Sequence, residues 1–445
     1  MLMPNLLTEA SGFSDEDIDV NARSTTQLMN DHNNHTKEAT LFDYIDVVGP
    51  GIIDELTILA SHLTGRSLKM VSSTKVGGGV AEMLHRIVPL LNELGIETTW
   101  DVIKGDDTFF NITKRFHNAL QGHKDRFTKK LFDTYLSYNE KNSDELDFDE
   151  DLIVIHDPQP LGLINWNQKR KNKWVWRCHI DLSHPHPHLW AFLKPFVEQY
   201  DAAIFSSPLF SPELTIPQYR FHPAIDPLAD KNRELDAGYI NSVLMNYGIP
   251  RDKPLVTQIS RYDPWKDPVG VIQAFKMARK YVDCRLLLVG DKASDDPETD
   301  TMLKKVREEA QDDPDIHVLL FNPSKATEIN AFQRASNIVT QKSLREGFAL
   351  TVSEALWKKR PVIGSAAGGI PAQIIDGYTG LLVHSVEGAG VAMRWLLNQP
   401  DFAQQLGENG HQRVKDNFLI TKHLKRYLLL LLTLDKQKDH TIILR

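Results

Sequence analysis

The feature that most constrains the fold is an alternation of short apolar runs with segments of helical periodicity, which occurs twice along the chain. In the first round, strands are predicted at residues 68–72, 96–102, 152–156, 174–179 and 202–205. In the second round, strands are predicted at 255–259, 285–289, 316–321, 338–340, 362–363 and 381–383. Apolar strands that alternate with helices indicate parallel, doubly wound sheets. The sequence therefore predicts an α/β protein whose two doubly wound parallel-sheet domains face each other across a cleft.

Helical periodicity fills the intervals between these runs. Helices are predicted at residues 41–63, 83–94, 109–120, 190–200, 269–278, 300–310, 326–334, 387–398, 401–415 and 419–434, with a further helix beginning at Phe348. Prolines near residues 220–227 mark the connection between the two rounds. We therefore expect a flexible extension at 1–40, a first domain at 41–222 and a second domain at 223–417. The final helix, at 418–435, is expected to return to the first domain.

Composition narrows the class of protein. A chain of 445 residues exceeds the size at which a single hydrophobic core stops growing, which agrees with two domains. The net charge of −8 argues against a nucleic-acid-binding protein. Two cysteines, Cys178 and Cys284, are too few for a disulfide framework or a cysteine zinc site. The acidic N-terminus does not resemble a secretory signal and no apolar run could span a bilayer, so we expect a cytoplasmic protein without a membrane anchor.

Two glutamates mark the stretch from Leu344 to Trp357. Glu346 lies in a glycine-containing turn, and Glu354 follows about two turns into the helix that is predicted to begin at Phe348. A helix N-terminus presents unpaired N–H groups and the positive end of the helix dipole, which suit a diphosphate. One carboxylate could then face a sugar while the other reaches a second part of the same ligand. The spacing alone leaves open a solvated surface helix with two acids.

Two cations follow the first predicted strand of the second half. Arg261 and Lys266 share a short loop at the carboxyl end of that strand, where open α/β sheets bind their ligands. A guanidinium fork and an ammonium group both suit a diphosphate. Together with helix N–H groups, they could stabilise a leaving nucleoside diphosphate without a metal. No Asp-x-Asp motif stands where it would hold magnesium or manganese, so neither a metal nor another cofactor is expected.

A glycine loop follows the first predicted strand of the first half. Gly77, Gly78 and Gly79 separate this strand from a helix, and such a loop can bring backbone close to a phosphate or a sugar. The loop lacks both the Walker Lys-Ser/Thr ending and the spaced G-x-G-x-x-G fingerprint. A tight turn without a ligand is the alternative interpretation.

Histidine and aspartate recur at the ends of two later strands of the first half. His156 and Asp157 end one strand, and His179 and Asp181 follow the next. The carboxyl ends of parallel strands meet at one edge of a sheet, so these side chains are expected to converge on the cleft. Each of them could instead be a capping or turn residue.

Together these features resemble the retaining glycosyltransferases of family 4, which have the GT-B fold of two Rossmann-like domains. The resemblance rests on Arg261-x4-Lys266, Glu346-x7-Glu354 and the glycine loop, spread over two α/β halves. Longer motifs resemble those of the trehalose glycosyltransferring synthases. These motifs are VSST from Val71, GGGVAE from Gly77, HDPQP from His156, WRCHIDLS from Trp176 and SRYDPWK from Ser260. The resemblance covers residues 44–427 approximately.

The resemblance implies roles for the matching residues. Arg261, Lys266 and the N–H groups of Leu350 and Thr351 would hold the diphosphate. Glu354 would bind the ribose, and Glu346 with the backbone after it would hold the glucose. The implied donor-binding set is Gly78, Gly79, Arg261, Lys266, Glu346, Gly347, Phe348, Ala349, Leu350, Thr351 and Glu354. The implied acceptor-binding set is His156, Asp157, His179 and Asp181, and the implied catalytic set is His179, Asp181, Arg261, Lys266 and Glu346.

Two positions depart from the family pattern. Lys266 is followed by Asp267, where family members commonly have glycine, and Phe348 is followed by Ala349, where glycine is also frequent. An extra carboxylate beside a diphosphate could weaken binding or turn outward. The departures therefore put the fine donor preference in doubt, while the later loop at 368–371 matches the pattern.

The implied reaction is transfer of glucose from UDP-glucose or ADP-glucose to glucose, which gives α,α-trehalose with retention and can run in both directions. A retaining trehalose phosphorylase, with phosphate at Arg261 and Lys266, and a transferase with another sugar acceptor are the open alternatives. A regulator without activity would be expected to lose Glu346 and the two cations. Neither half has the clean glycine fingerprint of a dinucleotide oxidoreductase. The expected partners are small molecules, not nucleic acid or membrane, and a homodimer is left open.

Overall fold

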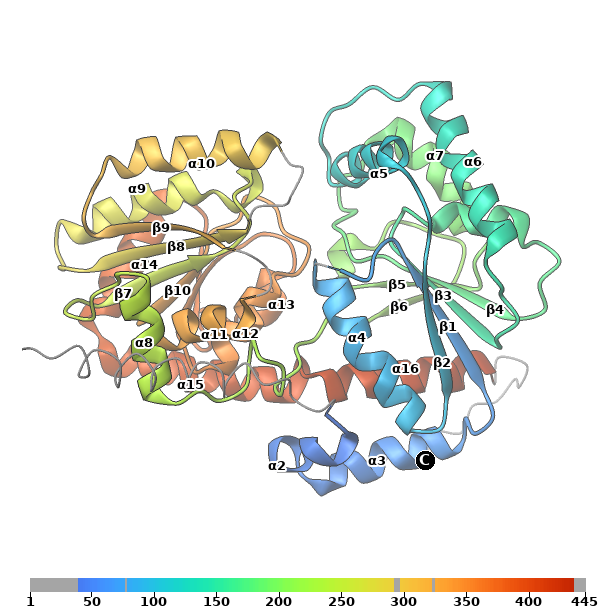
Figure 1. Ribbon diagram of the computed structural model, residues 1–445, viewed down its shortest axis with the longest axis horizontal. Helices are drawn as coiled ribbons and strands as arrows, with labels where there is room; N and C mark the ends of the chain where they lie inside the picture. The colour runs from blue at the N-terminus through green and yellow to red at the C-terminus, as the bar shows by residue number, and fades with distance from the viewer. Residues whose placement is uncertain (1–38, 77, 292–296, 322–324, 436–445) are drawn as a thin grey trace, which may run out of the picture.

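The computed structural model describes residues 39–76, 78–291, 297–321 and 325–435, and these form two α/β halves that lie side by side (Figure 1). The first sheet has the strand order β2-β1-β3-β4-β5-β6, and the second has the order β12-β11-β10-β7-β8-β9. Neighbouring strands are parallel throughout both sheets. The predicted architecture of two doubly wound parallel sheets is therefore confirmed. Residues 1–38 of the predicted extension and Gly77 lie outside the described residues.

The first half contains six strands and the helices around them. The strands are β1 (Ser67–Ser72), β2 (Glu97–Val102), β3 (Leu152–His156), β4 (Lys173–Arg177), β5 (Ala202–Phe205) and β6 (Gln218–Arg220). The helices are η1 (Leu41–Tyr44), α2 (Ile45–Val48), α3 (Pro50–Ser61), α4 (Gly78–Glu93), α5 (Asp107–Leu120), α6 (Lys129–Glu145), η2 (Leu161–Trp166), α7 (Pro187–Val197) and η3 (Pro208–Phe210). Every residue of β3 is buried, because apolar clusters cover both faces of the sheet.

The second half repeats this plan. Its strands are β7 (Leu255–Ile259), β8 (Arg285–Asp291), β9 (Ile316–Phe321), β10 (Ile338–Gln341), β11 (Val362–Ser365) and β12 (Leu381–Val383). Its helices are α8 (Ala237–Asn246), η4 (Pro264–Lys266), α9 (Pro268–Arg279), α10 (Pro297–Ala310), α11 (Ala326–Ala335), α12 (Leu350–Trp357), α13 (Ile370–Gln373), α14 (Val386–Asn398) and α15 (Pro400–Asn417). The last helix of the chain, α16 (Ile420–Asp435), follows them and returns to the first half. Because β7 and β10 are central and parallel, the loops after them meet at one edge of the sheet.

The chain passes between the halves twice, and the two passages are joined by backbone hydrogen bonds. The Ile225 N–H donates to the Phe418 carbonyl at 2.9 Å, and the Ile420 N–H donates to the Ile225 carbonyl at 2.9 Å. After the second passage, α16 runs beneath the first sheet and packs against α3 and α4 (Figure 1). Leu424 and Leu428 of α16 are fully buried in the core of the first half. Among the described residues, no helix combines the length and apolarity needed to cross a membrane.

Candidate active site

A buried ion pair joins the loops that follow β7 and β10. Asp263 caps the short helix η4 by accepting hydrogen bonds from the N–H groups of Trp265 and Lys266, which fixes the start of the Lys266 side chain. Lys266 Nζ then lies 2.6 Å from Glu346 Oε2, and the Ser343 hydroxyl donates to the same oxygen at 3.0 Å. The two charged side chains are only 18% and 8% exposed. The structure thus brings together the cation that was predicted to hold the diphosphate and the carboxylate that was predicted to hold the glucose.

Two glycines support the turn that carries Glu346. Gly368 has φ +57°, and a Cβ placed there would lie 1.7 Å from the Glu346 carbonyl oxygen. A Cβ on Gly369 would lie 2.7 Å from the Gly347 carbonyl oxygen, which accepts a hydrogen bond from the Gly369 N–H at 3.0 Å. Only glycine permits backbone segments to approach this closely. The glycine pair therefore forms the support on which the turn at Glu346 rests.

Helix α12 begins later than the sequence suggested. Ala349 adopts a left-handed conformation with φ 66°, so the helix begins at Leu350 and the prediction of a start at Phe348 was wrong. Consequently Glu354 lies one turn into the helix, not two as expected. Ala349 offers no side-chain cap, and no acidic residue occupies the first turn. The N–H groups at this end, including those of Leu350 and Thr351, are thus suited to an anionic ligand.

Glu354, one turn into α12, is buried and has polar neighbours. It is 3% exposed, receives a weak hydrogen bond from Gln333 Nε2 at 3.4 Å, and lies 3.8 Å from Lys231 Nζ. Lys231 also lies 2.6 Å from Glu82 on α4 of the first half. Burial lowers the pKa of the nearby Lys358 to about 7, an effect that the charge of Glu354 opposes. The Glu354 carboxylate is therefore linked to both halves of the molecule.

Arg261 extends from the donor-side loop toward the first half. Its side chain is 60% exposed, with Nη2 3.3 Å from Asp263 Oδ2. Burial lowers the pKa of His117 on α5 to about 4, and the positive charge of Arg261 adds to this effect. Arg261 is thus near the first half and accessible to a ligand. Within the described part of the chain, its ion pair is with Asp263 and not with Glu346, the partner of Lys266.

The carboxylate of Asp267, where the family pattern commonly has glycine, has partners other than Lys266. Asp267 is the N-cap of α9, where its Oδ1 accepts a hydrogen bond from the Gly270 N–H at 3.1 Å. The other oxygen, Oδ2, forms an ion pair with the buried Lys342 at the end of β10. Sequence inspection did not single out Lys342 or Ser343, although their place directly after a predicted strand was a usable signal.

In the first half, two imidazoles lie against each other, one at the end of β3 and one after β4. His156 Nδ1 lies 3.0 Å from His179 Nε2, and the two rings are stacked with centroids 5.3 Å apart. Burial, and then the charge of Arg177, lowers the pKa of His156 to about 3. The same causes bring the pKa of His179 well below its ordinary value. Both rings are therefore neutral at pH 7, so one donates its N–H group to the other.

The aspartates hold the backbone around this histidine pair. Asp157 has φ 66°, and its Oδ1 accepts a hydrogen bond from the His179 N–H at 2.8 Å. Burial raises the pKa of Asp157 to about 7. Asp181 Oδ1 accepts a hydrogen bond from the Ser183 N–H at 2.8 Å, so Asp181 shapes the following turn. Arg177, which the sequence did not single out, is fully buried behind the pair and donates to the Phe221 carbonyl at 2.9 Å.

The facing edges of the two halves meet at several contacts, three of which involve predicted site residues. A Cβ on Gly79 would lie 2.7 Å from Leu350 Cδ1, which places the start of α4 against the start of α12. A Cβ on Gly347 would lie 3.1 Å from the His179 carbonyl oxygen. The rings of His222 and Phe348 stack with centroids 5.5 Å apart. Gly78, with φ +78°, begins α4 beside Gly79. The predicted donor and acceptor residues thus lie on facing edges of the two halves.

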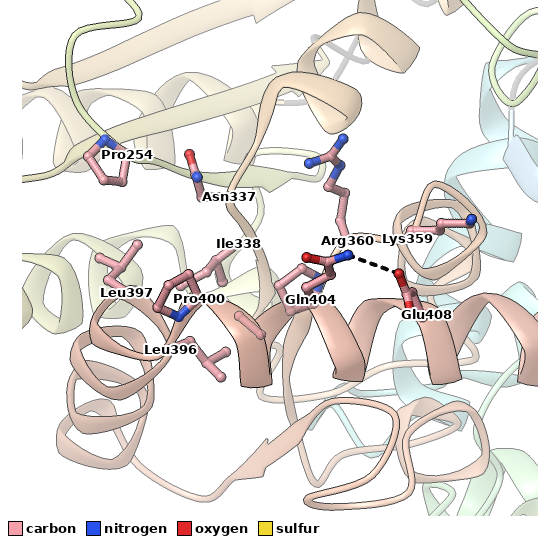
Figure 2. A pocket seen from close by; sticks show the side chains of 12 residues that line it. Pro254, Asn337, Ile338, Lys359, Arg360, Leu396, Leu397, Pro400, Gln404 and Glu408 are labelled. Atoms are coloured by element: carbon pink, nitrogen blue, oxygen red, sulfur yellow. Dashed lines mark hydrogen bonds between the residues drawn. The ribbon is translucent and has the colours of Figure 1, made fainter.

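A separate pocket lies at the other edge of the second sheet. It has a volume of about 470 Å³ and is lined by residues that precede β7, β10 and β11 and by residues of α14 and α15. Figure 2 shows Pro254, Asn337 and Ile338 on its wall, together with the hydrogen bond between Gln404 and Glu408. These residues stand at the amino ends of the strands, away from Lys266 and Glu346. Among the residues that the structure describes, no group of three histidine, cysteine, aspartate or glutamate side chains is arranged to hold a metal ion.

Comparisons with known proteins agree with this geometry. Residues 70–212 match the family described as trehalose synthase, N-terminal domain, and residues 245–413 match glycosyl transferases group 1. A trehalose synthase from Thermococcus litoralis is 45% identical over 398 residues, which cover 88% of this chain and 96% of the relative. A trehalose phosphorylase from Grifola frondosa is 30% identical over 429 residues, which cover 84% of this chain and 58% of the relative.

A solved structure shows the same fold at low sequence identity. An α,α-trehalose-phosphate synthase (UDP-forming) from Burkholderia xenovorans superposes with a TM-score of 0.67 at 14% identity and covers 83% of this chain and 100% of its own. The fold and the family matches define the protein as a glycosyltransferase with the GT-B fold. Within this class, the chain belongs to the trehalose synthase family. The resemblance drawn from the sequence motifs is thereby confirmed.

Proposed function

We propose that this glycosyltransferase moves glucose from a nucleoside diphosphate glucose, either UDP-glucose or ADP-glucose, to free glucose and forms α,α-trehalose. The reaction retains the α configuration of the donor and can run in both directions. The observation that carries this proposal is the Lys266–Glu346 ion pair, which lies beside the start of α12 and opposite the neutral His156–His179 pair. The trehalose synthases among the relatives support trehalose as the product.

The donor would lie along the second half. Lys266, Arg261 and the first N–H groups of α12 would stabilise the negative charge that develops on the leaving diphosphate. Glu346 would bind hydroxyl groups of the transferred glucose, with the backbone of Gly347, Phe348 and Ala349 beside it. Glu354 would accept hydrogen bonds from the ribose. Three positive sources and two carboxylates thus match a ligand with an anionic centre and two polar ends.

The acceptor would lie along the first half. His179 approaches the transferred sugar, while His156, Asp157 and Asp181 shape the pocket in which the second glucose binds. A neutral His179 can exchange hydrogen bonds with sugar hydroxyls without placing a positive charge beside an oxocarbenium-like carbon. Retention would then follow from attack on the same face as the departing diphosphate, without a protein nucleophile and without a metal.

The test is incubation of the purified protein with glucose and, separately, UDP-glucose, ADP-glucose and glucose 1-phosphate. We expect a disaccharide from at least one nucleotide sugar, and its identity as α,α-trehalose can be established by NMR of the two equivalent anomeric protons. Trehalose from glucose 1-phosphate alone would replace the proposal with a trehalose phosphorylase. If glucose is not accepted with any donor, the acceptor assignment is wrong, and sugar phosphates are the next acceptors to supply.

A further inference from the structure

Two ion pairs join the loops after β7 and β10. In the first pair the cation is in the loop after β7, and in the second pair the cation is in the loop after β10. Lys266, after β7, pairs with Glu346, after β10. Its neighbour Asp267 pairs with Lys342, which lies at the end of β10. The Leu344 N–H also donates to the Trp265 carbonyl at 2.7 Å, so the loops are joined by backbone as well. The first pair contains Lys266, which is proposed to bind the diphosphate, whereas the second contains the adjacent residue, Asp267.

Asp267 holds an uncommon backbone conformation. Its φ of 48° and ψ of 49° are left-handed, which is unfavourable for a residue that has a side chain. Both carboxylate oxygens have partners, because Oδ1 caps α9 through Gly270 and Oδ2 is bound by Lys342. Lys342 is 5% exposed, so its charge is directed at Asp267 and is little screened by water. The pair therefore stabilises a conformation that places Lys266 in the site.

The charge of Asp267 matters because of its position. A carboxylate adjacent to a diphosphate-binding lysine would repel the diphosphate unless a cation cancels it. Lys342 supplies that cation. A second acid near Lys342 is Glu387, at the start of α14. Hydrogen bonds from its own N–H group and from Ser385 lower the pKa of Glu387, and the charge of Lys342 adds to this effect. Without Lys342, the Asp267 carboxylate would keep its hydrogen bond from Gly270 but would lose its ion pair.

We propose that Lys342 is a positioning residue for the donor. Its ion pair with Asp267 compensates the negative charge next to Lys266. The same pair holds the loop after β7 in place when Lys266 leaves Glu346 and binds the diphosphate. This inference rests on the proposed function, since it assumes that Lys266 binds a diphosphate. It explains how the chain accommodates aspartate at a position where the family pattern has glycine.

The test first measures binding of UDP and of ADP to the wild-type protein by titration calorimetry. It then compares binding of the tighter nucleotide, written as UDP below, in Lys342→Met, Asp267→Asn and the double variant. Asparagine retains the cap and tolerates left-handed backbone but has no charge. We expect Lys342→Met to weaken UDP binding about fivefold to thirtyfold, from the Coulomb energy of one uncompensated charge near the site. Asp267→Asn should leave binding unchanged or tighten it, and the double variant should recover most of the affinity lost in Lys342→Met. Lys276→Met, at the far end of α9, is the control for loss of one positive charge.

The outcomes separate this inference from the proposed function. If the wild-type protein binds UDP and Lys342→Met binds it equally well, the inference is overturned while the proposed function stands. The inference also fails if both single variants weaken binding and the double variant is no better than Lys342→Met, because that pattern indicates only a structural role. If the wild-type protein binds neither UDP nor ADP, the proposed function itself fails, and the inference fails with it. Thermal unfolding of each variant verifies that the protein is folded.

Discussion

Replacement of Glu346 by glutamine should separate nucleotide binding from sugar transfer. Glu346 lies 2.6 Å from Lys266 Nζ and would therefore compete with a diphosphate for that cation. A hydrogen bond to a charged group contributes about 1.5–3 kcal/mol, and a neutral amide retains only part of it. We expect Glu346→Gln to release Lys266, so that UDP binds with equal or up to about tenfold higher affinity.

The same substitution should slow turnover strongly. Loss of a buried charged acceptor for the glucose hydroxyls removes about 2–4 kcal/mol of transition-state stabilisation, which is about 30-fold to 1000-fold in kcat. Lys266→Met should behave in the opposite way toward nucleotide, with UDP binding weakened about tenfold to 100-fold. The Ser343 hydroxyl remains able to donate to position 346 in both variants, which limits rearrangement of the turn.

The assay combines titration calorimetry with UDP and initial rates of trehalose formation over a range of donor concentrations. The control is Lys276→Met, which removes a lysine from the far end of α9. The reasoning would be refuted if Glu346→Gln weakened UDP binding as much as Lys266→Met does. That result would place Glu346 at the diphosphate instead of at the sugar. Unchanged rates in Lys266→Met at every donor concentration would remove Lys266 from the diphosphate site.

Three further predictions follow from the described geometry. Gly368→Ala should destabilise the protein by about 2–5 kcal/mol in thermal unfolding, because its Cβ would clash with the Glu346 carbonyl oxygen. The control is Gly377→Ala, which has open space around its Cβ position and should cost about 1 kcal/mol. Equal losses of stability in the two variants would contradict this explanation. The pKa of His156 is lowered to about 3 in the folded protein, so between pH 3 and 6.5 this residue binds more protons in the unfolded chain than in the folded protein. The contribution of neutral His156 to the free energy of unfolding is therefore fully present above pH 6.5 and is lost as the pH falls. His156→Gln should therefore reduce the loss of unfolding free energy between pH 7 and pH 5 by about 2 kcal/mol. The free energy is measured by urea denaturation with tryptophan fluorescence. An unchanged loss would show that His156 is not buried in its neutral form. Chelator should leave the transferase activity intact, and complete loss that magnesium restores would contradict the metal-free proposal.

The parts of the fold that the sequence predicts well are those in which burial alone decides the structure. Strands β3, β5, β7, β9 and β12 have the predicted bounds, because each is a short apolar run between polar turns. Several elements were not predicted, namely α6, α8, α13, β6 and the short 3-10 helices η2, η3 and η4. In α6 the buried face includes Asn139 and Asn142, so the apolar periodicity is incomplete. Strand β6 has three residues, and none of them is buried, as is common at a sheet edge.

The site was predictable to the extent that its residues lie directly after strands. His156 and His179 could be placed at one sheet edge from their positions alone, and the structure brings them to 3.0 Å. The start of α12 could not be placed, because an alanine in left-handed backbone has no signal in its own sequence. Lys342 was missed for a related reason. Its importance depends on the direction in which the Asp267 side chain turns, and this direction is set by the cap of α9.

The path of α16 means that the two halves of this enzyme are not separable pieces of sequence. Its residues Leu424, Tyr427 and Leu428 complete the core of the first half, although they are encoded after the whole of the second. A chain divided in the loop before α8 would yield a first fragment with an uncovered apolar groove against α3 and α4. The second fragment would carry the apolar helix that fills that groove. The protein is therefore suited to reassembly from two co-expressed fragments, and unsuited to the study of either half in isolation.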